Sequence, residues 1–179
     1  PETAVIPNAV NPSEFYKMPK DEAREKLGIG ANERVAVFVG AFCERKGVLR
    51  TVEAVEKVPD LKLILIGSGE QKPQSGRIIF SGRAAHNEIA KYLNAADMFV
   101  LPTLAEGCCN AVVEAMACGL PIVSSNLPFN DDVLDENNSI RINPKNIDEI
   151  ADALRLLSEN AQLREKLSQG SLRTAAELV

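Results

Sequence analysis

The chain has 179 residues, the size of a single domain, and its 45% hydrophobic and 25% charged residues are those of a folded globular protein. This composition excludes intrinsically disordered and fibrous proteins. The formal net charge of −5 argues against duplex nucleic acid as the main partner, because phosphate backbones are bound by basic faces. A small anionic ligand is still compatible, since it needs only a local positive site.

The cysteines and the single histidine argue against a structural zinc site. The four cysteines are Cys43, Cys108, Cys109 and Cys118, without C-x-x-C spacing, and His86 is the only histidine. Neighbouring cysteines rarely pair with each other, so we interpret all four as buried free thiols in a reducing cytosol.

No apolar stretch approaches the roughly 18 residues of a membrane span. The chain begins at Pro1, without an initiator methionine or a signal peptide. We therefore expect a piece of a longer protein, located in the cytoplasm, with any peripheral membrane contact made through a domain that this chain lacks.

Residues 1–33 are expected to be a linker remnant followed by a short helix. Val5-Ile6-Pro7-Asn8 predicts an extended piece that ends in a turn, because proline disfavours helix in the residue before it. A short helix is predicted from Asp21 to Leu27, with Gly28 as its end.

From residue 34 onward, apolar strands alternate with amphipathic helices. The run 34–39 (RVAVFV) is typical of a strand buried on both faces, and valines recur at helical spacing through 47–58. Further strands are predicted at 62–66, 77–80, 97–101, 121–124 and 139–142. Further helices are predicted at 86–94, 109–118, 146–158 and from 160 towards 174.

This alternation predicts an α/β fold: a doubly wound, Rossmann-like parallel sheet of about six strands with helices on both faces. We expect one domain, with its sheet core over 34–145 and its C-terminal helices over 146–179. Ligands of such folds bind at the carboxyl ends of the strands. The expected positions of the site are therefore the loops after Val39, Ile66, Phe80, Leu101 and Ser124.

Two glutamates bracket the junction between the fourth strand and its helix. Glu106 is expected in the loop, and Glu114 about one turn into the helix. A carboxylate among apolar residues is costly unless it has a partner, and it can accept both hydroxyls of a sugar diol. The alternative is that Glu106 and Glu114 are both ordinary solvent-exposed residues near a helix start. The apolar neighbours of Glu114 make this alternative less favourable.

Arg45 and Lys46 stand just before the predicted helix 47–58. Cations at a helix N-terminus oppose its dipole, unless cations and dipole address one anion such as a diphosphate. The alternative is a solvated surface pair.

Other motifs carry less chemistry. Gly67-Ser68-Gly69 resembles a dinucleotide-binding fingerprint but Lys72 replaces the third glycine, which favours a tight turn. His86 is interpreted as a surface residue at a helix start. No Asp-x-Asp sequence occurs, so we expect no obligatory metal cofactor.

The ordered set of motifs resembles the C-terminal half of the group 1, GT-B fold glycosyltransferases (family 4). The order and spacing match over roughly residues 5–170. The matching motifs are VIPN at 5–8, FVG at 38–40, RKG at 45–47, LIGSG at 65–69, ADMFVLP at 96–102, and Glu106-x7-Glu114 followed by AMACGLPIV at 115–123.

The resemblance implies a domain that binds a UDP-, GDP- or ADP-sugar for transfer with retention at the anomeric carbon. It implies that Glu106 lies by the donor sugar as the catalytic residue, that Glu114 bonds the ribose hydroxyls, and that Lys46 holds the diphosphate. Gly82 and Arg83 would border the base. The other expected donor-site residues are Arg45, Gly40, Gly107, Cys108, Cys109 and Asn110.

The chain departs from the family pattern at two places. Ala41 stands where the family often has arginine, and we expect Arg45 to supply that charge. After the motif glycine, the family usually has Phe or Leu together with a small residue, and this chain has Cys108-Cys109 instead. The identity of the donor sugar is therefore left open. The acceptor, a sugar or a lipid-linked glycan, would be held by an N-terminal domain absent from this chain, and the chain alone is expected to transfer no sugar.

Three other functions were weighed. A GT-B module that binds a nucleotide without transfer is favoured by Ala41 and disfavoured by the intact glutamate pair. A GT-B phosphorylase or sugar-nucleotide epimerase does not usually combine this glutamate spacing with the lysine turn. An NAD-dependent Rossmann enzyme is disfavoured by the missing third glycine and by the lack of an acidic residue at the end of the second strand.

Overall fold

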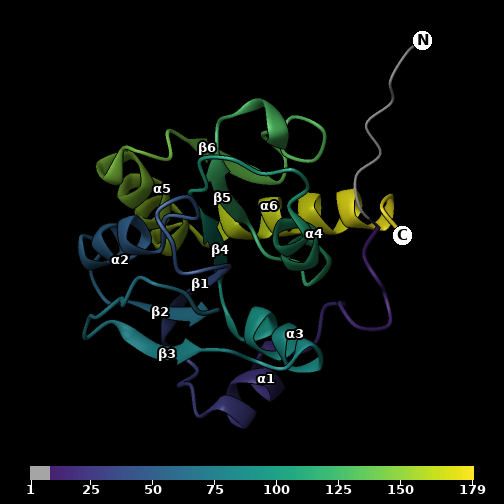
Figure 1. Cartoon of the computed structure of the whole chain (residues 1–179). Coiled ribbons are helices and arrows are strands. Elements are labelled where there is room, and N and C mark those ends of the chain that lie inside the picture. The colour runs from purple at the N-terminus through teal and green to yellow at the C-terminus, as the bar shows by residue number, and fades with distance from the viewer. Residues whose placement is uncertain (1–8) are drawn as a thin grey trace.

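The computed structural model describes residues 9–179, so the motif predicted at 5–8 lies outside the described residues. It contains one six-stranded parallel sheet in the order β3-β2-β1-β4-β5-β6 (Figure 1). The strands are β1 (Arg34–Val39), β2 (Leu61–Ile66), β3 (Ile78–Gly82), β4 (Met98–Leu101), β5 (Ile122–Ser125) and β6 (Ser139–Ile142). The helices are α1 (Lys20–Leu27), α2 (Val48–Glu56), α3 (His86–Ala95), α4 (Asn110–Ala117), α5 (Ile147–Glu159) and α6 (Ala161–Ala176). The predicted Rossmann-like fold is confirmed, with each predicted element within two residues of its observed bounds; a short 3₁₀ turn, Pro128–Asn130, was not predicted.

Strand β1 lies at the centre of the sheet, and its sequence explains this position. Val35 to Phe38 are completely buried, as expected for an apolar strand with a neighbour on each side. Val37 is in register with Ile64 of β2 and with Phe99 of β4. Strand β3 alternates between exposed and half-buried residues, because it is an edge strand.

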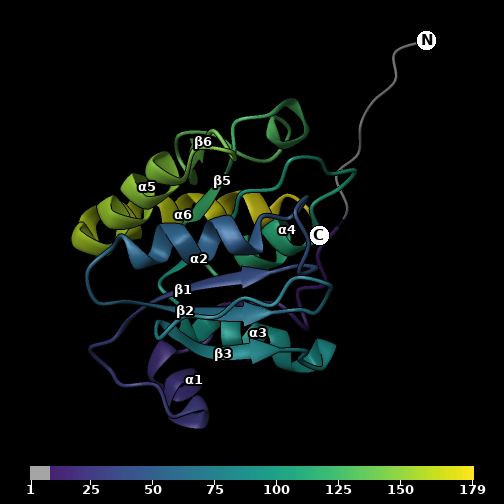
Figure 2. The same ribbon diagram turned by 60° about the vertical axis from the view of Figure 1, so that its left-hand side comes forward.

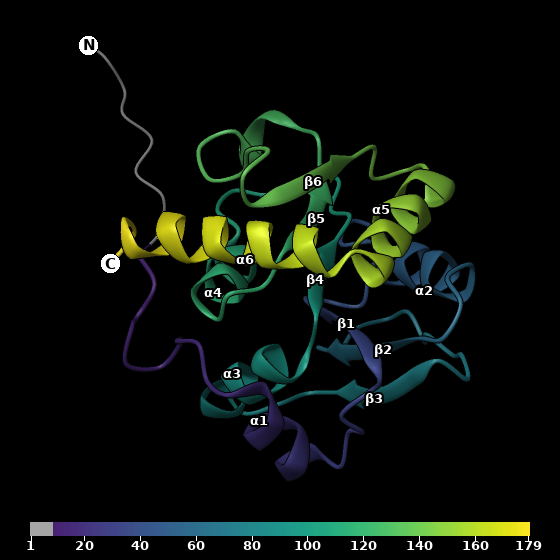
Figure 3. The same ribbon diagram turned by 180° about the vertical axis from the view of Figure 1, so that it is seen from behind.

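Helices cover both faces of the sheet. Helices α2 and α5 pack together on one face, while α1, α3, α4 and α6 lie on the other (Figures 2 and 3). The long α6 runs along α4, and the backbone N–H of Val10 donates to the carbonyl of Leu178 at 2.9 Å. The first described residues therefore lie beside the end of the chain.

The strand order reverses between β1 and β4, and the loops after these two strands flank that switch point. The loops after β1, β2 and β3 are joined to each other at the same edge. The N–H of Phe42 donates to the carbonyl of Ser68 at 2.9 Å, and that of Gly67 to Gly82 at 2.9 Å. These bonds connect three of the five expected site loops to one another.

The prediction of a tight turn at 67–69 is wrong, because the structure has no regular turn there. This segment is irregular and runs against the loop after β1, so closely that a Cβ atom on Gly67 would lie 1.9 Å from the carbonyl oxygen of Gly40. The same atom on Gly69 would lie 2.4 Å from the carbonyl oxygen of Phe42. The two glycines are needed for close backbone approach.

Candidate donor site at the carboxyl edge of the sheet

Lys46 and Glu106 face each other across the switch point. The Lys46 ammonium forms an ion pair with Oε1 of Glu106, and the side chains are only 16% and 7% exposed. The same oxygen accepts a hydrogen bond from the Thr103 hydroxyl at 2.9 Å. The stem of Lys46 crosses Gly40, where a Cβ atom would lie 3.6 Å from Cδ of the lysine. The structure thus brings together three of the predicted site residues: Gly40, Lys46 and Glu106.

Arg45 adds a second cation on the same side. Its Nη1 lies 3.9 Å from Oε2 of Glu106 and donates to the carbonyl of Ala105 at 2.7 Å. Its own carbonyl accepts from the N–H of Leu104 at 2.8 Å. The loops after β1 and β4 are therefore tied together at the two predicted cations.

Gly47 and Arg50 hold the loops after β1 and β4 close together. Gly47 has a φ of 80°, and a Cβ atom there would lie 2.8 Å from the carbonyl oxygen of Pro102, so the start of α2 presses on the end of β4. Arg50 donates from Nη1 to the carbonyl of Glu44 at 3.1 Å and from Nη2 to that of Pro102 at 3.0 Å. Its Nε donates to Pro144 at 2.8 Å. One side chain therefore joins the loops that follow β1, β4 and β6.

The loop before α4 contains the predicted residues Gly107, Cys108 and Cys109. Gly107 and Cys108 are exposed, and Cys109 occupies the position just before the helix. Burial raises the pKa of the Cys109 thiol to about 12, and that of Cys118 likewise to about 12. Both thiols are therefore neutral near pH 7.

The four cysteines are free, as expected, but the expectation that all are buried is wrong. Cys118 alone is buried; Cys43 and Cys109 are half-buried, and Cys108 is exposed. Cys108 lies in the loop between β4 and α4, on the surface of the protein.

Glu114 lies on the second turn of α4 and lines a separate pocket of about 320 Å³. Asn110 from the same helix, His86 from the start of α3, and Glu14 also line it. Burial raises the pKa of Glu114, His86 opposes this effect, and Glu14 adds to it. The two predicted glutamates therefore lie in two different places, Glu106 beside Lys46 and Glu114 in the pocket that His86 also lines.

His86 is exposed at a helix start, as predicted, with 61% of its side chain accessible. It nevertheless lines the pocket of Glu114, which sequence reasoning missed. Its Nε2 lies 3.3 Å from Oε2 of Glu14, and its ring meets Phe15 edge-on at 5.4 Å between centroids. Glu14 carried no sequence signal, because it is 72 positions away from its partner.

Gly82 and Arg83 lie where β3 ends, at the same edge of the sheet. Nε of Arg83 donates to the hydroxyl of Ser68 at 3.0 Å, which ties the loop after β3 to the loop after β2. The expected contact of Gly82 and Arg83 with the nucleotide base stays a prediction.

Thr103 was missed as well. It is completely buried at the end of β4, and its backbone carbonyl accepts a hydrogen bond from the Ser125 hydroxyl at 2.5 Å. Its position three residues before Glu106, directly after a strand, was the available signal. Thr103 holds the orientation of the Glu106 carboxylate from inside the protein.

Among residues 9–179, no three or more His, Cys, Asp or Glu side chains are grouped so that they could hold a metal ion. In the same part of the chain, no helix has both the length and the apolar character needed to cross a membrane.

Comparison with known proteins identifies the family. The family model described as "Glycosyl transferases group 1" matches residues 19–173. A Bacillus subtilis (strain 168) protein named "Putative teichuronic acid biosynthesis glycosyltransferase TuaC" is 31% identical over 159 residues, covering 86% of this chain and 41% of TuaC. An Escherichia coli protein named UDP-Gal:alpha-D-GlcNAc-diphosphoundecaprenol alpha-1,3-galactosyltransferase is 31% identical over 171 residues, covering 84% of this chain and 44% of its own length.

Solved structures agree with this assignment. Sucrose-phosphate synthase from Thermosynechococcus elongatus superposes with a TM-score of 0.89 at 25% identity, covering 99% of this chain and 48% of that protein. Anabaena HepE, solved with UDP-glucose, has the same fold, with a TM-score of 0.85 at 22% identity over 98% of this chain and 53% of HepE. The chain spans less than half the length of the two curated relatives. It belongs to the group 1 glycosyl transferases and has the fold of one GT-B domain.

Proposed function

We propose that this chain is the nucleotide-sugar donor domain of a retaining glycosyltransferase whose acceptor domain lies in the rest of the protein. The observation that carries the proposal is the meeting of Lys46, Arg45 and Glu106 at the carboxyl edge of the sheet, beside the switch point. The family assignment supports the transferase activity. In this proposal residues 9–33 lead into the domain, 34–145 form its sheet core, and 146–179 form its C-terminal helices.

The two cations would stabilise the leaving group. A nucleoside diphosphate gains negative charge as it departs, and a fixed ammonium and guanidinium lower the energy of that charge. Lys46 is already held in place by its ion pair with Glu106. Phosphate oxygens would take over the ammonium, and this exchange would free the Glu106 carboxylate for a hydroxyl of the donor sugar.

The orientation of Glu106 does not depend on Lys46 alone. The Thr103 hydroxyl bonds the same carboxylate oxygen and would keep the carboxylate in position while the lysine turns to the diphosphate. Retention at the anomeric carbon is part of the proposal through the family resemblance, with the acceptor attacking from the face that the leaving group vacates.

Glu114 would recognise the ribose. Its carboxylate lies in a pocket at the side of α4, next to Asn110, where it can accept hydrogen bonds from both hydroxyls of a ribose. Gly82 and Arg83, at the end of β3, would border the base. Gly107, Cys108 and Cys109 would lie along the donor sugar, so their side chains would influence which sugar fits.

A UDP-sugar is the first donor to try. HepE was solved with UDP-glucose, and the Escherichia coli relative is named for transfer from UDP-Gal. GDP- and ADP-sugars are the alternatives, and a sugar or a lipid-linked glycan is the proposed acceptor. A cytoplasmic location, with any membrane contact made through the acceptor domain, belongs to the same proposal.

Calorimetry on the 179-residue chain tests donor binding. UDP, GDP and ADP should bind more tightly than the matching nucleosides, and one base should be preferred. The absence of any nucleotide binding would contradict the proposal. Addition of NAD is the control for a dinucleotide-binding enzyme, and it should give no heat of binding.

Activity must be measured on the full-length protein, with this chain as the comparison. Catalysis requires donor and acceptor within attack distance, so the full-length protein should transfer sugar and the chain alone should not. Turnover by the chain alone would contradict the two-domain proposal. Binding without transfer in the full-length protein would identify a binding module, and release of sugar phosphate or epimerised donor would identify a phosphorylase or an epimerase.

A further inference from the structure

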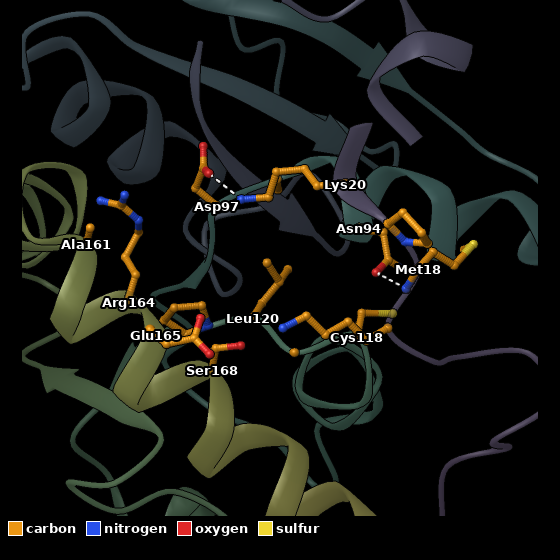
Figure 4. Close-up of a pocket in the computed structure, with 15 residues that line it drawn as sticks. Met18, Lys20, Asn94, Asp97, Cys118, Leu120, Ala161, Arg164, Glu165 and Ser168 are labelled. Carbon is orange, nitrogen blue, oxygen red and sulfur yellow. Dashed lines mark hydrogen bonds and ion pairs between the residues drawn. The ribbon is translucent and has the colours of Figure 1, made fainter. Parts of the chain in front are cut away.

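A second cavity, of about 400 Å³, lies at the amino-terminal edge of the sheet. Its walls come from four places: the segment 17–20 before α1, residues 94–97 before β4, residues 118–121 before β5, and the first turns of α6 (Figure 4). Strands β4 and β5 start at this cavity and run away from it towards Glu106. The cavity is therefore on the opposite edge of the sheet from the donor site.

The floor of the cavity contains a carboxylate with more cations than it can neutralise. Asp97, whose side chain is 1% exposed, pairs with Lys20 at 2.7 Å, with Arg24 at 3.0 Å and with Arg34 at 3.1 Å. It also accepts from the N–H of Val35 at 2.8 Å. One negative charge thus faces three positive charges, and Lys20 points to it from the cavity wall (Figure 4).

Two more cations line the cavity without a carboxylate partner. Lys17 has no hydrogen bond or ion pair with any residue from 9 to 179, and its stem lies against Gly119, where a Cβ atom would be 3.2 Å from its Cδ. Nη1 of Arg164 donates only to peptide carbonyls, those of Leu157 at 2.6 Å and Ser158 at 2.9 Å. Burial and the nearby Arg34 lower the pKa of the Arg164 guanidinium, and Asp97 opposes this effect.

The charges of this region add up to an excess of positive charge in an acidic chain. Among the residues that line the cavity, the cations are Lys17, Lys20 and Arg164 and the carboxylates are Asp97 and Glu165; Arg24 and Arg34 pair with Asp97 from behind the wall. The whole chain has a net charge of −5, so the excess is local. An anionic ligand would offset it.

We propose that this cavity binds a small phosphate monoester through Lys17, Lys20 and Arg164. Lys17 and Lys20 come from the segment before α1 and Arg164 comes from α6, so cations on two sides of the cavity can reach the several terminal oxygens of a phosphate group, which a flat carboxylate does not offer. Ser168 adds a hydroxyl, and Met18, Leu120 and Pro121 add an apolar wall for the organic part. The volume lies in the range of about 300–1,000 Å³ that small-molecule sites occupy, and it suits a ligand of monosaccharide size.

Calorimetry with ribose 5-phosphate on the 179-residue chain tests the proposal. Ribose 5-phosphate should bind, inorganic phosphate should bind more weakly, and ribose should not bind. Lys17→Met should weaken binding of ribose 5-phosphate by about 10-fold or more, because it removes one charge-assisted contact. Lys17 has no partner in residues 9–179, so this variant should fold and melt like the parent chain.

Two control variants separate the cavity from other phosphate-binding places. Lys166→Met makes the same charge change on an exposed residue of α6 that does not line the cavity, and it should leave binding unchanged. Lys46→Met removes a cation of the proposed donor site, so ribose 5-phosphate that still binds this variant, and is lost from Lys17→Met, occupies the cavity.

The proposal is overturned if ribose 5-phosphate does not bind, or if Lys166→Met weakens binding as much as Lys17→Met does. It is also overturned if Lys46→Met abolishes binding while Lys17→Met does not, because the ester would then occupy the donor site. Binding to vesicles that contain an anionic phospholipid, without binding of the soluble ester, would assign the cations to a membrane surface instead.

Discussion

The two edges of the sheet each place a carboxylate among cations, and the two arrangements differ in how replaceable the cations are. At the amino edge, Asp97 is bonded to Lys20, Arg24, Arg34 and a backbone N–H. Arg24 is itself buried, and its other nitrogens are bonded to four backbone carbonyls. This set fastens α1 and the start of β1 to the start of β4.

At the carboxyl edge, the cations of Glu106 are held more loosely. Lys46 bonds only the carboxylate, and Arg45 is half exposed in the loop after β1. A ligand can therefore replace the carboxylate as their partner without breaking a network behind them. The difference between the edges lies in what else holds the cations: Arg24 is fixed by four backbone carbonyls, whereas Lys46 has only the carboxylate as a partner among residues 9–179.

The largest expected effect comes from Asp97→Asn. Loss of the charge leaves the buried Arg24 without a counter-charge, which should lower the free energy of unfolding by about 3–5 kcal/mol. Denaturant unfolding measures this loss, with Asp148→Asn as a control on an exposed pair that should change little. Equal effects of the two variants would erase the distinction drawn for Asp97.

The pH dependence of stability offers an independent check on Asp97. Burial alone would raise its pKa, but Lys20, the Val35 N–H and Arg24 outweigh burial and hold the pKa below its ordinary value. The stabilisation is therefore complete above the ordinary pKa of an aspartate and is lost as the pH falls through the lowered value. The Asp97→Asn variant should lack this part of the acid dependence.

Next in size is the effect of Lys46→Ala on diphosphate binding. The variant should bind UDP with about 1.5–3 kcal/mol less free energy, or about 10- to 150-fold more weakly, because a charge-assisted contact is lost. Binding of uridine should change little. Calorimetry with both ligands measures the difference, with Lys57→Ala, an exposed lysine paired to Asp148, as the unchanged control. Equal losses for UDP and uridine would reject the diphosphate role.

A somewhat smaller effect is expected from Glu114→Gln on the choice of ribose over deoxyribose. The amide keeps the shape but turns one acceptor into a donor, so one ribose hydroxyl loses its partner at a cost of about 1–3 kcal/mol, or about 5- to 150-fold in affinity. The loss should shrink for the 2′-deoxyribonucleotide. If the parent chain shows no ribose preference, the proposed role of Glu114 is wrong.

The smallest effect is that of Glu114→Gln on stability. Burial raises the pKa of Glu114, so the folded chain binds its proton more tightly than the unfolded chain does. Stability should therefore rise as the pH falls from the raised value towards the ordinary pKa of a glutamate. The variant should melt no lower than the parent near pH 7, and its advantage should disappear in acid.

The groups that face Glu114 set the controls for that titration. His86 from α3 opposes the raised pKa and Glu14 from the preceding segment adds to it, so both must be intact in the compared proteins. Melting curves of parent and variant across the acid range give the difference. A lower melting temperature of the variant at every pH would instead make Glu114 an anchor of the fold.

Local sequence patterns were sufficient for the fold and for part of the site. The apolar run of β1 and the helical spacing of valines in α2 each depend on neighbouring residues, and both were predicted within two residues. Lys46 and Glu106 were named as candidates because each lies in a loop that follows a strand, and the structure brings the two side chains together. Their roles stay a prediction.

Partners far apart in the chain escaped prediction. Asp97 was predicted only as the first residue of a strand, yet its cations lie 63 to 77 positions away. His86 and Glu14 are separated by 72 positions. These residues meet only in the folded chain, so no periodic pattern in the sequence indicates that they are partners.

Arg50 has a consequence for how the site can change in evolution. The acceptors that it bonds after β1, β4 and β6 include three peptide carbonyls, of Glu44, Pro102 and Pro144, and every amino acid supplies a carbonyl. The frame of these loops therefore tolerates substitution of the side chains displayed on them. Under the proposed function, exchange of Cys108 and Cys109 would change which donor sugar fits while the backbone that carries Glu106 keeps its course.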